Sequence, residues 1–187
     1  MEDATCLTGQ LLIAMPAMLD PNFRRTVTYI CEHSEEGALG LVINRPMDID
    51  LGRIFEQLSM EPADPVLASQ PIMCGGPVQT ERGFVIHESG DQWETSADIK
   101  DSIRVTTSQD ILTAMASGKG PSRSMVALGY AGWGAGQLEW EISENSWLSV
   151  PANSTILFDT PFDDRWNEAA ALLGVDLTTL SMDAGHA

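Results

Sequence analysis

Short apolar runs of strand length, separated by turn signals, fill the first half of the chain. Leu7–Ala14 and Thr26–Glu32 have strand character, the second because it is rich in β-branched residues. Asp20-Pro21-Asn22 predicts a turn between them. Ala38–Asn44 is a continuous apolar run, which is typical of a buried strand. The first half of the chain is therefore expected to consist mainly of strands joined by turns.

Helical patterns are fewer. In Asp50–Met60 apolar residues recur every three or four positions, which predicts a short helix capped by Asp50. Thr107 and Asp110 resemble a capping box, and the helix that they begin is expected to end at Gly118. These two helices interrupt the strands without alternating with them regularly.

The rest of the chain continues this irregular mixture. The expected helices are Gln137–Glu144 and Thr160–Gly174, and the expected strands are Gly83–Glu88, Ile103–Thr106, Met125–Tyr130, Ser146–Val150 and Ile156–Phe158. Such mixing favours an α+β fold over a doubly wound α/β fold. The 187 residues show no internal repeat or long linker, so residues 1–187 are expected to form a single domain.

The charge balance excludes several classes of partner. The chain has 10 Lys and Arg against 27 Asp and Glu, a net charge of −17. A nucleic-acid-binding protein needs clustered cations to neutralise phosphates, and here only Arg24 and Arg25 are adjacent. We therefore expect no direct contact with nucleic acid, and none with anionic membrane surfaces.

The cysteine count and the N-terminus indicate a cytoplasmic protein. Cys6, Cys31 and Cys74 are too few and too dispersed for a disulfide framework, which favours free thiols in a reducing compartment. Glu2 and Asp3 stand where a signal peptide would carry Lys or Arg, and no run approaches the ~20 apolar residues of a membrane span. We expect a cytoplasmic monomer.

A glycine-rich segment invites comparison with cofactor sites. Gly132-x-Gly134-x-Gly136 follows a predicted strand, but the dinucleotide pattern requires a third glycine where Gln137 stands. A loop in which glycines allow close packing or positive φ is the alternative interpretation. The three histidines, with no paired-ligand spacing, do not predict a metal site. We expect neither a cofactor nor a metal.

Cys31-Glu32-His33 is the one candidate for nucleophilic catalysis. On a strand, residues i and i+2 share a face, so His33 could activate the Cys31 thiol. The alternative is a buried, inert cysteine beside an unrelated histidine. Reaction of Cys31 as an ordinary thiol would exclude the catalytic interpretation.

Arginine is scarce in this acidic chain, so the positions of the arginines are informative about a possible binding site. Arg25 follows a turn, Arg45 lies between Asn44 and a proline at the end of a strand, and Arg82 follows a glycine turn. Strand ends and glycine turns offer backbone N–H groups to an anion, and arginine adds bidentate recognition of carboxylate or phosphate. The alternative is internal pairing with the many carboxylates.

Eight sequence blocks, taken together, resemble the YqgE/AlgH family of bacterial proteins. They are Gly9–Pro16, Asp20–Val27, Cys31–His33, Gly40–Pro46, Gly75–Val78, Arg82–His87, Gly129–Glu139 and Asn145–Leu148, in order over almost the whole chain. Cys74 departs from the family, in which the position before Gly-Gly-Pro is commonly apolar or aromatic.

The resemblance implies a cytosolic α+β protein without an established enzymatic activity. Its fold would have a large, split, mixed or antiparallel β-sheet that partly closes into a small barrel and is flanked by helices. One branch of the family is named as a regulator of transcription of exopolysaccharide genes. With this charge, any such regulation would act through a protein or a small-molecule partner.

Three functions remain open from the sequence. The favoured one is a non-catalytic, regulatory protein that binds a small anionic ligand or a protein partner in one polar cleft. The expected cleft residues are Arg25, Asn44, Arg45, Gly75, Gly76, Arg82, Gly132, Trp133 and Gln137. The second is a thiol enzyme or redox sensor that uses Cys31 with His33, and the third is an interaction scaffold without a pocket.

Overall fold

A computed structural model describes residues 5–90, 92–177 and 179. In this part of the chain one sheet contains β1 Gln10–Ala14, β2 Val27–Ser34, β3 Gly37–Val42, β4 Pro46–Asp50, β5 Pro71–Cys74, β6 Val78–Glu88, β7 Ser96–Lys100, β8 Ile103–Thr106, β9 Ser124–Gly134 and β10 Trp147–Pro151. The helices are α1 Leu51–Gln57, α2 Pro65–Ala68, α3 Asp110–Ala116, α4 Gln137–Ser143 and α5 Arg165–Ala171. None of the described helices is long and apolar enough to cross a membrane.

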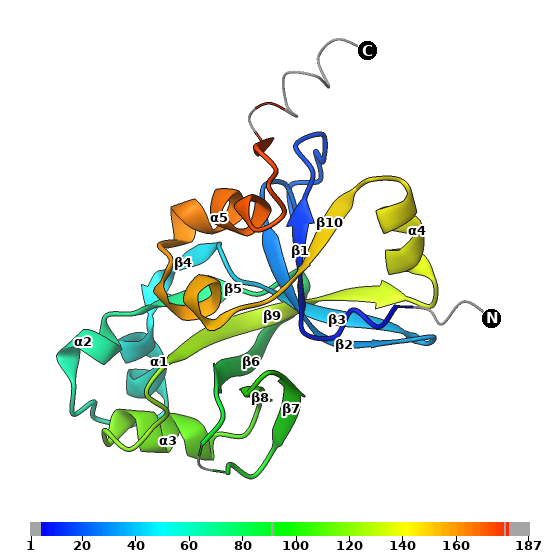
Figure 1. Ribbon diagram of the computed structural model, residues 1–187. Coiled ribbons are helices and arrows are strands. Elements are labelled where there is room, and N and C mark those ends of the chain that lie inside the picture. Colours follow the sequence, from blue (N-terminus) through cyan, green and yellow to red (C-terminus); the bar gives the residue numbers. More distant parts are fainter. Residues whose placement is uncertain (1–4, 91, 178, 180–187) are drawn as a thin grey trace.

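The sheet has two halves that meet at β9. Its main order is β10-β1-β2-β3-β9-β6-β8-β7, with β5 added to β9 in parallel and β4 added to β5. The C-terminal part of β9 pairs with β3, and its N-terminal part pairs with β6. β9 therefore crosses the centre of the molecule and belongs to both halves (Figure 1).

The sheet curls until its far strands approach each other. Gly9, just before β1, has φ +82°, and a Cβ at this position would lie 2.7 Å from the Cβ of Lys100 in β7. Only glycine allows this approach between the two ends of the sheet. The α+β prediction, with a split sheet that partly closes into a barrel, is confirmed.

Three hydrophobic clusters hold the layers together. Alternation along β1 sends Leu11 into the largest cluster, which also contains Trp166 of α5, and Leu12 into a second cluster beneath α4. A third cluster, which includes Phe55 of α1 and Met115 of α3, packs these two helices on the sheet. Helices thus cover the sheet in separate places (Figure 1).

Several helix ends lie where capping residues in the sequence predicted them. Asp50 caps α1 by accepting a hydrogen bond from the Arg53 N–H at 3.0 Å. The helix predicted over Gln137–Glu144 is α4, and Gly174 follows α5 with φ +69°. The Asp50 cap, the helix α4 and the end at Gly174 are confirmed. The start expected at Thr160 is wrong, because Phe162–Asp164 form a 3-10 helix and α5 begins only at Arg165.

The capping-box prediction is wrong. α3 begins at Asp110 with Gln109 at the cap position, and Thr107 makes no side-chain cap. The Asp110 carboxylate instead accepts from Ser108 Oγ at 2.5 Å and from the Glu94 N–H at 2.7 Å. Asp110 therefore ties the start of α3 to the segment before β7.

The prediction of a strand at Ile156–Phe158 is also wrong. Thr155–Asp159 forms a π-helical turn, which Asn153 Oδ1 supports by accepting from the Ile156 N–H at 2.8 Å. Ile156 and Leu157 are buried, as they would be in a strand, so their apolar character could not distinguish the two structures.

The glycine segment is not the loop that was expected. Gly132 and Gly134 lie in β9 and pair with β3, while Gly129 and Gly136 have positive φ. The strand thus continues to Gly134, and a short turn at Ala135 and Gly136 leads into α4. The last predicted turn, Asp176–Met182, lies largely outside the described residues.

Candidate functional site

Three of the nine expected site residues come together at the turn between β1 and β2. Arg45 donates to the carbonyl oxygens of Pro21 and Asn22, each at 2.7 Å, and of Arg24 at 2.9 Å. Asn44 accepts from the Val27 N–H and donates to the Arg25 carbonyl, both at 2.9 Å. Asn44 and Arg45 therefore hold the turn in place, and their polar groups are used internally.

The turn presents two further arginines to a surface cleft of about 350 Å3. This arginine cleft is lined by Pro16, Met18, Leu19, Arg24, Arg25, Trp166, Asn167 and Leu177. Arg25 has φ +58°, and its guanidinium lies 4.8 Å from the centre of the Trp166 ring. Trp166 is itself fixed, because its Nε1–H donates to the Ala14 carbonyl at 2.8 Å.

Arg24 and Arg25 have no ion-pair partner among the described residues. Elsewhere in that part of the chain, Arg104 pairs with Asp98, and Arg123 pairs with Glu88 and Asp159. Both cleft arginines are exposed, although the chain carries 27 acidic residues. The turn therefore concentrates unpaired positive charge in a strongly negative protein.

Gly75 and Gly76 have a packing role. A Cβ on Gly75 would lie 2.3 Å from the Gly129 carbonyl oxygen. Gly76 has φ +155°, and a Cβ there would lie 2.2 Å from the carbonyl oxygen of Tyr130. Both glycines are buried, so they let two backbones cross and do not offer N–H groups to a ligand in solvent.

Arg82 stands apart from the arginine cleft. Its guanidinium lies 5.0 Å from the Phe84 ring centre and 6.0 Å from that of Tyr130. This exposed cation rests on aromatic faces, an arrangement worth about 0.5–1 kcal/mol at such a site.

Trp133 packs beneath α4, and Gln137 is the exposed first residue of that helix. Gln137 accepts from the Gly134 N–H and donates to Glu141, and Glu141 also accepts from the indole N–H of Trp133 at 3.3 Å. Gly132 precedes them in β9. The nine expected residues thus divide among four places and do not form one cleft.

One aromatic contact connects two of these places. Phe23, in the arginine-bearing turn, lies with its ring centre 6.2 Å from Trp133 and 5.7 Å from Trp147. Phe23 therefore packs the arginine-bearing turn against Trp133 and Trp147.

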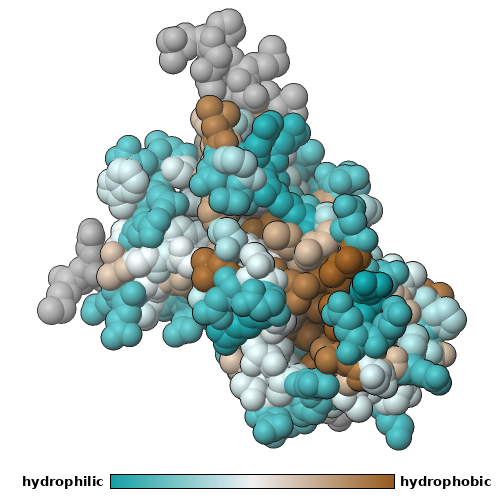
Figure 2. Space-filling view, turned by 180° about the vertical axis from the view of Figure 1, so that it is seen from behind, coloured by the Kyte–Doolittle hydropathy of each residue, from teal (hydrophilic) through white to brown (hydrophobic). Residues whose placement is uncertain are grey.

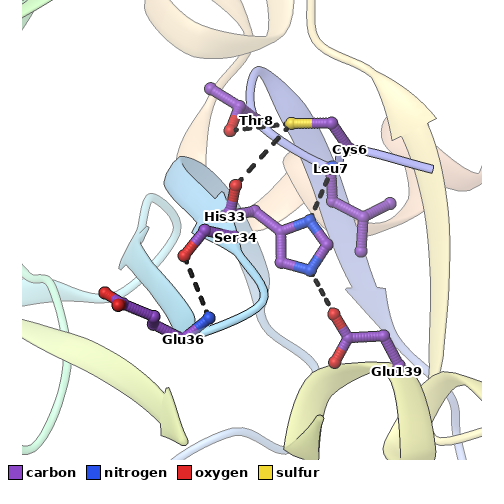
Figure 3. Close-up of polar contacts among 7 residues, drawn as sticks. All are labelled: Cys6, Leu7, Thr8, His33, Ser34, Glu36 and Glu139. Carbon is purple, nitrogen blue, oxygen red and sulfur yellow. Dashed lines mark hydrogen bonds and ion pairs between the residues drawn. The ribbon is translucent and has the colours of Figure 1, made fainter. Parts of the chain in front are cut away.

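The structure does not support the pairing of Cys31 with His33. The Cys31 thiol points to the Tyr29 carbonyl at 3.8 Å, and burial raises the pKa of this thiol to about 12. His33 Nδ1 accepts from the Leu7 N–H at 2.9 Å, and Nε2 pairs with Glu139 (Figure 3). Both ring nitrogens are thus engaged, and the thiol stays protonated at neutral pH.

The sequence analysis did not single out two residues, one with a reactive thiol and one with a buried charge. Cys6 is exposed, and its hydrogen bond to Thr8 lowers the pKa of its thiol (Figure 3). Arg165 is 3% exposed at the start of α5. A signal for Arg165 existed, since it is the one basic residue after Leu128, against nine acidic ones.

The comparisons with known proteins agree with one another. The chain matches the family model DUF179, described as AlgH-like, over residues 11–178. A UPF0301 protein of Nitrosococcus oceani is 53% identical over 179 residues, covering 96% of each chain. A UPF0301 protein of Thioalkalivibrio sulfidiphilus is 56% identical over 180 residues, again covering 96% of each.

Solved structures show the same fold. The solution structure of the AlgH protein from Pseudomonas aeruginosa matches with a TM-score of 0.79 and 49% identity, covering 97% of this chain and 96% of that one. A crystal structure of a Corynebacterium diphtheriae protein matches in fold with a TM-score of 0.75 at 21% identity, covering 97% and 94%. The chain belongs to the AlgH-like family.

Proposed function

We propose that this protein is a non-catalytic, cytoplasmic binding protein that holds a small organic anion in the arginine cleft. The observation that carries this proposal is the exposed pair Arg24 and Arg25, which has no ion-pair partner among the described residues and faces one cleft. In a chain with 10 basic and 27 acidic residues, two adjacent arginines that face one cleft form an unusual concentration of positive charge.

The shape of the cleft fits a ligand larger than an inorganic ion. Its volume of about 350 Å3 is at the lower end of the ~300–1,000 Å3 range of small-molecule sites. Two guanidinium groups would bind a carboxylate or phosphate. Leu19 and Trp166 would contact an apolar or aromatic part, and the Asn167 amide could donate or accept a hydrogen bond.

Binding is favoured over catalysis by the character of the lining. Among the described residues, the cleft is lined by Pro, Met, Leu, Arg, Trp and Asn side chains, none of which is a usual general acid, general base or nucleophile at neutral pH. Cys31 does not provide an alternative catalytic centre, because its thiol is buried and protonated.

Any regulatory consequence would pass through a ligand or a protein partner. The net charge of −17 opposes direct contact with DNA, since phosphate neutralisation needs a basic surface. Hydrophobic residues gather across the middle of one face (Figure 2), and Trp140 of α4 is 63% exposed. These features favour a protein partner as the second candidate function.

A thermal-shift screen against a library of carboxylates and phosphorylated metabolites tests the proposal. A ligand at about 100 times its Kd stabilises the native state by ~2.7 kcal/mol, or about 5–10 °C for a domain of this size. Arg25→Ala and Arg24→Ala should abolish the shift. Arg53→Ala is the matched control, because Arg53 is exposed on α1 and makes only a 4.0 Å pair with Glu56.

Two results would contradict the anion proposal. One is a library in which no compound shifts the transition of the wild-type protein, which would favour the protein partner. The other is a hit whose shift persists in both Arg24→Ala and Arg25→Ala.

A further inference from the structure

Arg165 is a buried arginine that forms no ion pair with any described residue. It opens α5 with 3% of its surface exposed. Its Nε–H donates to the Thr160 carbonyl at 3.0 Å, and Nη1 donates to the Ile43 carbonyl and to Met125 Sδ, the latter at 3.4 Å. These hydrogen-bond partners are neutral, so among the described residues the positive charge is offset by dipoles and by the Phe162 ring, without an anion.

None of the described carboxylates next to Arg165 in the sequence pairs with it. Asp159, at the end of the π-helical turn, pairs with Arg123, which also pairs with Glu88 at 2.7 Å. Asp163 and Asp164 are exposed. Arg165 makes no ion pair with any described residue, and burial lowers its pKa to about 10. An arginine buried in this way is costly unless an anion compensates it.

One nitrogen of the guanidinium is left available. Nη2 has no hydrogen bond to a described residue, whereas Nε and Nη1 are used. Among the described residues, two buried side-chain polar atoms have no hydrogen-bond partner, Thr28 Oγ1 and the Tyr29 hydroxyl. Nη2 is not among these buried, unpaired atoms, and Arg165 lines a pocket.

This arginine lines a small pocket next to β9. The Arg165 pocket has a volume of about 130 Å3 and is lined in part by Gln70, Ser124, Met125, Phe158, Phe162 and Arg165. The Phe162 ring centre lies 4.6 Å from the guanidinium carbon. At ~30 Å3 per liquid water, the volume equals roughly four waters, which suits one oxyanion group but not a nucleotide.

We propose that the Arg165 pocket binds a small oxyanion, as a carboxylate or a phosphate group. Oxygens of the anion accept from Nη2 of Arg165, and the Ser124 hydroxyl and the Gln70 amide supply neutral donors. The aromatic rings of Phe158 and Phe162 exclude water and strengthen these bonds. This site is separate from the arginine cleft, which Arg24 and Arg25 define, and does not depend on it.

NMR titration of the full chain tests the pocket directly. The side-chain Nε–H resonance of Arg165 should move and saturate when acetate or inorganic phosphate is added at constant ionic strength. The stronger of the two anions identifies the chemistry, and sodium chloride is the control for ionic strength. An equal response to chloride, or no movement with either anion, would overturn the proposal.

Variants separate this site from the proposed cleft. Arg165→Lys removes Nη2 and should abolish binding, but it also loses internal bonds and can impair folding. Ser124→Ala and Gln70→Ala avoid that problem, and each should raise Kd about tenfold by removing a bond to a charged group. Arg25→Ala should leave this Kd unchanged. Unaltered affinity in both Ser124→Ala and Gln70→Ala refutes the assignment.

Discussion

Asn44 joins the start of β2 to the arginine-bearing turn, and its replacement by alanine removes both connections. The Val27 N–H and the Arg25 carbonyl each lose a 2.9 Å hydrogen bond. Val27 is fully buried, so its N–H is left without water or protein to pair with. Each lost bond costs about 1 kcal/mol, and an unsatisfied buried donor costs ~1–3 kcal/mol.

We therefore expect Asn44→Ala to lower the free energy of unfolding by about 2–3 kcal/mol. For a domain of this length that is a fall in Tm of about 5–10 °C. Urea denaturation, followed by tryptophan fluorescence, measures the change directly. Arg25 should also lose its fixed position, so any ligand of the arginine cleft should bind more weakly.

Asn22→Ala is the matched control, since it makes the same chemical change in the same turn. The Asn22 backbone is used, but its side chain makes none of the described hydrogen bonds. We expect a change within about 0.5 kcal/mol, as at ordinary surface positions. Equal stability of Asn44→Ala and Asn22→Ala would show that Asn44 does not hold the turn.

Three further predictions follow from other contacts. Cys6 should react with a thiol reagent in the folded protein at neutral pH, because its pKa is lowered, and Cys31 should not; comparing Cys6→Ser and Cys31→Ser by reagent absorbance checks this. The hydrogen bond from His33 lowers the pKa of Glu139 below 4.5, so its stabilising effect is present above that pH and lost as the pH falls through the lowered value. Wild type should thus exceed Glu139→Gln in stability at pH 6, and the difference should shrink below pH 4.5 in denaturation curves. Gly76→Ala should be far more destabilising than Gly118→Ala, because a Cβ at Gly118 meets nothing within 4 Å, and thermal unfolding of both variants measures the difference.

The sequence predicted those features whose causes are local. Asp50 and the first N–H groups of α1 are three residues apart, so the cap can be inferred from the chain alone. Gly174 ends the last helix for a similar reason. The strand pattern and its α+β interpretation also depend on short-range alternation.

Features that depend on distant partners were not predictable. Arg45 looked like a ligand-binding arginine, but its acceptors are carbonyls of a turn more than twenty residues earlier in the chain. Arg165 contacts the Ile43 carbonyl across 122 positions of the sequence. In both cases contacts with distant parts of the chain decided the role of the arginine.

Cys31 illustrates a local rule that failed. Residues i and i+2 share a face only in a regular strand. In β2 the register shifts between Ile30 and Glu32, so Cys31 is the extra residue of a bulge. The thiol therefore turns toward the core while His33 meets Glu139.

The pairing of β1 with β10 has a consequence for synthesis of the chain on the ribosome. Gln10 faces Pro151 and Ala14 faces Trp147, so one edge of β1 lacks its neighbour until residues 147–151 have been synthesised. During translation this strand exposes unpaired backbone groups and apolar side chains that attract other chains. The pairing of β1 with β10 must therefore form late in synthesis. Cells that express the protein rapidly would depend on chaperones to shield β1 until then.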